Sequence, residues 1–146
     1  MERYLLQVGL IVAVFIAAWR FGREPEKYVA TTYAGMLLAD SAFIILADDW
    51  FEPDYGALLV FRFGLDAAAF LAVTGIALRY DRWWVLWVGS AQFIAVMAHL
   101  LRAAAMPLPP FAYAVMERWP IWIALMFTAL GIWLSRNWEE RERTFT

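Results

Sequence analysis

The feature that most constrains this sequence is a series of five long apolar runs, separated by short connectors that carry most of the charge. A helix of about 20 apolar residues crosses the roughly 30 Å hydrocarbon layer of a membrane. Apolar residues make up 64% of the chain, well above the share in soluble domains. We therefore predict an all-α integral membrane bundle, one domain over residues 1–146. Its five transmembrane helices are expected at about 4–19, 28–47, 58–78, 83–103 and 119–134.

The basic residues are distributed unevenly among the connectors. Because consecutive spans alternate in direction, eight of the twelve Lys and Arg residues fall on one side and three on the other, while Arg62 lies within a span. Lys and Arg are retained on the cytoplasmic side of a membrane. We therefore predict an external amino terminus and a cytoplasmic carboxyl terminus. The eight are Arg20, Arg23, Lys27, Arg79, Arg82, Arg136, Arg141 and Arg143, and the three are Arg3, Arg102 and Arg118.

A proline-rich connector follows the fourth span. It reads Met106-Pro107-Leu108-Pro109-Pro110, and three prolines are incompatible with a helix there because they remove amide donors and restrict the residues before them. After it, residues 111–118 are expected to form a short helix at the outer membrane interface. Pro120 would then lie in the first turn of the last span, where a missing amide hydrogen costs nothing.

Several polar side chains share one membrane depth, in the outer half of three spans. A charged side chain at the bilayer centre costs roughly 2.5 kcal/mol or more, so such groups pair with one another or line a cavity. Helical spacing allows Arg62 to pair with Asp66 one turn away, and it places Gln92 and His99 on one face. The candidate polar pocket comprises Asp40, Arg62, Asp66, Gln92, His99 and Arg102, with Tyr113 and Glu117 expected to cap it from outside.

Three interpretations of this polar set are open. The first is a charge-balanced structural core, which fixes one arrangement of the helices. The second is an outward-opening pocket of a small transporter, channel or ligand sensor, in which His99 titrates and the arginines bind an anionic group. The third is a haem-binding anchor, in which His99 from two copies of the chain ligates the iron, because the chain has no second histidine.

Other chemistries find no support in the sequence. The chain has no cysteine, which excludes disulfides, iron–sulfur clusters and thiolate zinc sites. One histidine cannot supply the two-histidine motif of a zinc protease, and no serine lies beside a suitable base. The basic residues are not gathered into a nucleic-acid-binding face. We therefore expect no nucleic-acid partner and no enzyme, and we assign no catalytic residue and no metal ligand.

Small residues recur at helical spacing on two spans. Gly64, Ala68 and Ala72 are four residues apart on the third span, and Ala91 and Ala95 are four apart on the fourth. Such ridges let helix backbones approach closely where lipid offers no hydrophobic drive for association. We expect these two ridges to pack against each other inside one chain, with contact between copies as the alternative.

The connector between the third and fourth spans begins a distinctive run of charged and aromatic residues. It reads Arg79-x-Asp81-Arg82-Trp83-Trp84-x-Leu86-Trp87, followed by Gln92 and His99-Leu100-x-Arg102. This pattern resembles one found in small hydrophobic bacterial proteins without an assigned function, and it implies no activity. We expect a non-catalytic accessory or assembly subunit of a larger complex in a bacterial cytoplasmic membrane. Its partners would be the lipid bilayer and other membrane subunits or copies of itself.

Overall fold

The computed structural model describes the backbone of residues 2–50, 55–107 and 109–144, and the side chains of 5–46, 58–107 and 109–137 except those of residues 113 and 117. Within these residues all regular secondary structure is α-helical. Four helices contain a segment long and apolar enough to cross a membrane, and the first contains a shorter apolar segment, Leu5–Phe21. The helices are α1 (Glu2–Phe21), α2 (Glu24–Trp50), α3 (Tyr55–Tyr80), α4 (Trp83–Ala103) and α5 (Pro110–Thr144).

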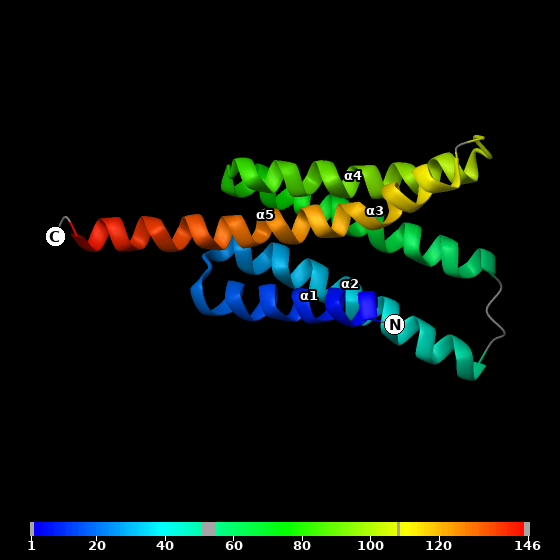
Figure 1. The fold of residues 1–146 in the computed structure, drawn as a ribbon, viewed down its shortest axis with the longest axis horizontal. Helices are drawn as coiled ribbons and strands as arrows, with labels where there is room; N and C mark the ends of the chain where they lie inside the picture. The colour runs from blue at the N-terminus through cyan, green and yellow to red at the C-terminus, as the bar shows by residue number, and fades with distance from the viewer. Residues whose placement is uncertain (1, 51–54, 108, 145–146) are drawn as a thin grey trace.

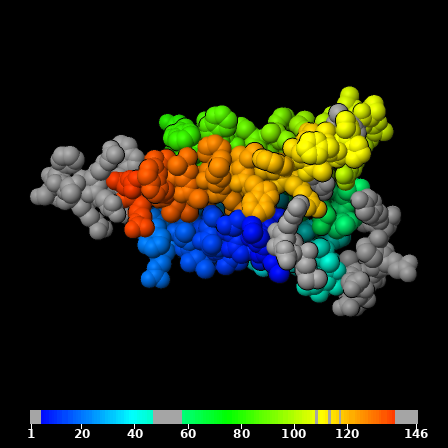
Figure 2. All heavy atoms as spheres, in the orientation of Figure 1, coloured from blue at the N-terminus to red at the C-terminus, as the bar shows by residue number. Residues whose placement is uncertain are grey.

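The helices pack in chain order into a closed circuit. Each contacts the next along the chain, α1 also contacts α5, and α2 reaches α5 across the circuit. Figure 2 shows one face of this arrangement, on which α5 lies between α4 and α1. The C-terminal turns of α5 extend past the ends of the other helices (Figure 1). At the opposite end, the C-terminal part of α2 and the N-terminal part of α3 both diverge from α4 and α5 (Figure 1).

The hydrophobic core is centred on α4, which has its most extensive contacts with α5 and α3. Half of the apolar segment of α4 is buried, against 17% for α2 and 11% for α3. The indole ring of Trp84 lies directly on Gly131 of α5, where any side chain would collide with it. The main cluster of buried apolar residues is Val29, Tyr33, Val73, Ala77, Trp84, Val85, Val88 and Ala124.

The segment after the proline-rich connector differs from the expectation. A separate interfacial helix over residues 111–118 was expected, but α5 runs without interruption from Pro110 to Thr144, with Pro120 inside it. Pro110 takes the first helical position, where its missing amide hydrogen is harmless. Pro120 removes one interior hydrogen bond and bends a helix rather than ending it. Figure 1 shows the first turns of α5 at an angle to the rest, so the predicted segment is the bent beginning of the last helix.

The two small-residue ridges also differ from the expected face-to-face packing. Ala91 and Ala95 of α4 are buried, but Gly64, Ala68 and Ala72 of α3 are exposed on the outside of the bundle. The buried side of α3 carries Ala69, Val73 and Ala77 instead, which lie on a different face of the helix from Gly64, Ala68 and Ala72. These residues include the bulkier valine, which fills the space between α3 and α4 better than a glycine would. The exposed ridge therefore does not hold α3 against α4.

The contact of Trp84 with Gly131 yields a test of the fold. A β-carbon at position 131 would lie 2.6 Å from the Trp84 ring, whereas one at Gly9 would meet no atom within 4 Å. We predict that Gly131→Ala lowers the free energy of unfolding by about 1–3 kcal/mol, because the buried indole must shift. Gly9→Ala, the matched control, should raise it by about 0.5–1 kcal/mol, because alanine favours a helix and meets no neighbouring atom there. Unfolding titrations in mixed micelles, followed by circular dichroism, measure both values, and equal stabilities would contradict the packing described here.

Candidate functional site: a polar network centred on Asp66

Three polar residues recur every seven positions along α2, and each contacts a different helix. Glu26, Tyr33 and Asp40 lie two helical turns apart, so they share one face of α2. Glu26 contacts α5, Tyr33 contacts α4 and Asp40 contacts α3. These contacts tie α2 to three helices, in addition to the packing of its buried apolar residues Val29 and Ala30.

Asp66 of α3 joins α3 to α4 through both of its carboxylate oxygens. The side-chain amide of Gln92 donates to Oδ1 at 2.7 Å and also lies 3.3 Å from the backbone carbonyl oxygen of Asp66. Nε2 of His99 lies 2.9 Å from Oδ2. An ionised carboxylate only accepts hydrogen bonds, so Nε2 is the donor in this contact when Asp66 carries its charge. The edge of the His99 ring packs against Phe63.

Tyr33 extends this network to α2. Its hydroxyl donates to Oε1 of Gln92 at 3.0 Å, and the tyrosine side chain is almost completely buried. Gln92 therefore accepts from Tyr33 with one end of its amide and donates to Asp66 with the other. A single amide thus bridges three helices, and its oxygen and nitrogen are both satisfied where burial would make an unpaired group costly.

Asp40 is held by a two-point contact with Arg62. Nε of Arg62 donates to Oδ1 at 3.0 Å and Nη2 donates to Oδ2 at 3.3 Å, the paired geometry that favours arginine over lysine. The rings of Phe43 and Phe61 stack nearby with their centroids 4.1 Å apart. The sequence indicated a pairing of Arg62 with Asp66 along α3, and the structure shows that Arg62 also links α3 to α2 through Asp40.

A second buried carboxylate lies at the other end of α2. Glu26 is 1% exposed, accepts a hydrogen bond from the hydroxyl of Ser135 at 2.8 Å and accepts another from the backbone amide of Arg23 at 2.8 Å. The second contact is half of a capping box, in which the third residue of a helix satisfies the amide at its start. At Gly22 a side chain would collide with the Ala18 carbonyl and with Glu26, so glycine is required where α1 turns into α2.

The structure brings together five of the eight residues expected to line a polar pocket. They are Asp40, Arg62, Asp66, Gln92 and His99, which form two adjoining groups on α2, α3 and α4. Arg102 lies in the last turn of α4, half-buried. Tyr113 and Glu117 belong to the first turns of α5, and their side chains lie outside the described residues.

Sequence reasoning missed three members of the network. Tyr33 lies in the second expected span but not in the expected pocket, Glu26 precedes that span, and Ser135 follows the last expected span. The seven-residue spacing of Glu26, Tyr33 and Asp40 is the signal that would have found the first two. Ser135 has no comparable signal, because its partner lies 109 positions away in the chain.

The hydrogen-bond donors and acceptors of this network pair with one another. Among the described side chains, no buried nitrogen or oxygen lacks a hydrogen-bond partner. The side chains of His99 and Asp66 keep 10% and 20% exposure, and those of Arg62 and Asp40 keep 36% and 28%, so both pairs are partly open to the surface. Under the haem interpretation, an iron bound at Nε2 of His99 would have to displace the contact of that nitrogen with Asp66. The chain matches no protein-family model, no curated protein and no solved structure.

Removal of the amide bridge tests the network. We predict that Gln92→Leu lowers the free energy of unfolding by about 2–4 kcal/mol, because it leaves the Tyr33 hydroxyl and one oxygen of Asp66 without their buried partner. Tyr33→Phe, which removes a single donor, should cost about 1 kcal/mol.

A matched control is Ser90→Ala, because the Ser90 hydroxyl is exposed and bonds only to the carbonyl oxygen of Leu86 in its own helix. Unfolding in mixed micelles measures all three variants. A Gln92→Leu variant as stable as Ser90→Ala would show that the bridge contributes nothing to the fold.

Proposed function

We propose that the protein is a non-catalytic accessory subunit, inserted in a bacterial cytoplasmic membrane, that binds another transmembrane helix through the outer face of α3. The bound helix belongs to a partner subunit or to a second copy of the chain. The observation that carries this proposal is the ridge of small residues that α3 turns away from its own bundle, which we call the outer ridge: Gly64, Ala68, Ala72 and Gly75.

The glycines whose surroundings the structure describes support this proposal because they fall into two classes. A β-carbon at Gly22, Gly89 or Gly131 would contact another part of the chain, so each of these glycines serves the packing of the bundle itself. A β-carbon at Gly64 or Gly75 would meet no atom within 4 Å, as is also true at Gly9 of α1 and Gly35 of α2. A glycine inside a helix weakens it by roughly 0.5–1 kcal/mol relative to alanine. Nothing within the described residues therefore accounts for glycine at these two positions.

The spacing along the outer ridge matches the requirements of helix association in lipid. Gly64, Ala68, Ala72 and Gly75 lie four, four and three residues apart, which keeps them on one side of α3. Where lipid surrounds the helices, association depends on close backbone approach rather than on hydrophobic burial, and small residues permit that approach. The neighbouring Leu71, 68% exposed, offers a larger side chain beside the ridge.

The distribution of basic residues supports an orientation within the membrane. Five arginines lie near one end of the bundle. At this end α1 connects to α2, α3 connects to α4, and α5 extends outward; the arginines are Arg20, Arg23, Arg79, Arg82 and Arg136. We propose that this end is cytoplasmic, with the amino terminus on the opposite side.

Cysteine scanning tests the docking surface cleanly, because the chain contains no native cysteine. Single variants Gly64→Cys, Ala68→Cys and Ala72→Cys are compared in native membranes with Ala129→Cys, an exposed alanine of α5. We predict slower reaction of the ridge cysteines with a membrane-permeant maleimide, because a bound helix covers them, and cross-linking between chains if the partner is a second copy. Equal labelling at all four positions, with no cross-linked species, would refute the proposed surface.

A second candidate function rests on the partial exposure of the His99–Asp66 pair. A histidine hydrogen-bonded to a carboxylate and partly open to the surface suits a small transporter or sensor that opens outward. This candidate predicts that His99→Gln and Asp66→Asn abolish solute-driven or proton-driven flux in proteoliposomes while leaving the yield of folded protein unchanged. Loss of folded protein in both variants would support a purely structural pair.

A further inference from the structure

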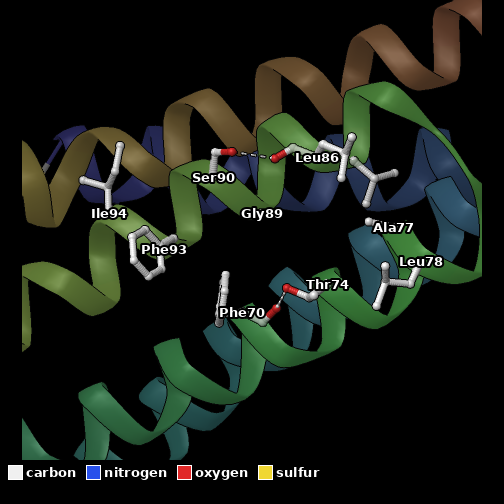
Figure 3. A pocket seen from close by; sticks show the side chains of 10 residues that line it. Phe70, Thr74, Ala77, Leu78, Leu86, Gly89, Ser90, Phe93 and Ile94 are labelled. Carbon is white, nitrogen blue, oxygen red and sulfur yellow. Dashed lines mark hydrogen bonds between the residues drawn. The ribbon is translucent and has the colours of Figure 1, made fainter.

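A groove opens on the surface between α3 and α4, away from the polar network. Its volume is about 440 Å³, within the range of roughly 300–1,000 Å³ typical of small-molecule sites. Figure 3 shows Phe70, Thr74, Ala77 and Leu78 along one wall and Leu86, Ser90, Phe93 and Ile94 along the other. The rings of Phe70 and Phe93, whose centroids are 5.6 Å apart, close one end of it.

The chemistry of the groove selects an apolar occupant. Its only hydroxyl groups belong to Thr74 and Ser90, and each donates to a carbonyl oxygen one turn back in its own helix, that of Phe70 or Leu86. Figure 3 shows both of these hydrogen bonds. Neither hydroxyl therefore has a donor proton to offer a ligand, and the remaining side chains are hydrocarbon.

The groove leads toward a basic turn at its other end. Leu78, 81% exposed, is followed directly by Arg79, and Arg82 precedes Val85 and Leu86 by three and four residues, at the start of α4. Both arginines are exposed, and neither forms an ion pair with a carboxylate among the described side chains. The turn keeps a net positive charge in spite of Asp81, which adopts a left-handed conformation with φ of 47°.

We propose that this groove binds one acyl chain of an anionic phospholipid, whose phosphate group is held by Arg79 and Arg82. The distance from Leu86 to Phe93 is seven residues, roughly 10 Å along the helix, which accommodates part of an acyl chain lying parallel to α4. An acyl chain gains little by leaving other lipid for an apolar groove. Selectivity therefore comes from the headgroup, and the phenyl pair sets how deeply the chain enters.

Retention of defined lipids during purification tests the proposal. The intact protein is mixed in neutral detergent with phosphatidylglycerol or phosphatidylcholine of identical acyl chains, and bound lipid is counted by native mass spectrometry. We expect phosphatidylglycerol to be preferred, and Arg79→Gln or Arg82→Gln to weaken its retention about fivefold each, the effect of one basic residue near an anionic headgroup. Arg20→Gln, at the same end of the bundle but on α1, is the matched charge control.

A second pair of variants tests the groove itself. Ser90→Phe fills it from α4 and Thr74→Phe fills it from α3, whereas Ala13→Phe adds the same ring to an exposed position on α1. Both filling variants should lose retained phospholipid relative to Ala13→Phe, with folding checked by circular dichroism and gel filtration. Equal retention in the filled and control variants, or equal loss in the Arg20 and Arg79 variants, would overturn the site and leave only non-specific attraction to charge.

Discussion

The polar contacts spaced seven residues apart along α2 are the constraint on which the arrangement of the bundle depends. Glu26, Tyr33 and Asp40 reach α5, α4 and α3 in turn, so one helix is tied to three others at regular intervals. A smaller share of the apolar segment is buried in α2 than in α4, and α2 contacts the other helices less extensively. In an apolar surrounding, hydrogen bonds and close packing replace the hydrophobic effect as the forces that associate helices. The position of α2 is therefore set by these three side chains together with its packing against α1 and its buried apolar residues.

The polar side chains of the network pair with one another, and this pairing bears on where a partner is proposed to bind. Gln92 satisfies Tyr33 and Asp66 at once, and Arg62 satisfies both oxygens of Asp40, so these groups compensate one another. Groups paired in this way specify one arrangement of helices, although they add little stability beyond what apolar residues would give. The features that remain unexplained by the bundle itself lie on its outside, at the outer ridge of α3 and in the groove between α3 and α4. For that reason we place both the proposed helix partner and the proposed phospholipid on the outside of the bundle.

Tryptophan and proline illustrate how the same residue type can have opposite consequences. Trp84 packs onto Gly131 in the core, while Trp83, its neighbour in the sequence, is 54% exposed. Pro110 begins α5, but Pro120 lies within it and the helix continues. A proline interrupts a helix only when nothing else holds the flanking turns in place, and packing of α5 against α4 and α1 supplies that support here. Expectations drawn from residue type alone therefore placed the start of the last helix too late.

The sequence alone determined the helical class and the approximate positions of the apolar helices, because these follow from composition and from the length of the apolar runs. It could not determine which partner each polar side chain takes. Arg62 can pair with Asp66 on its own helix, and only the tertiary structure assigns it to Asp40. The same holds for the direction in which the Gly64 ridge faces and for the contact of Glu26 with Ser135. Periodicity fixes which residues share a face, but the rotation of each helix about its axis is set by all of its neighbours together.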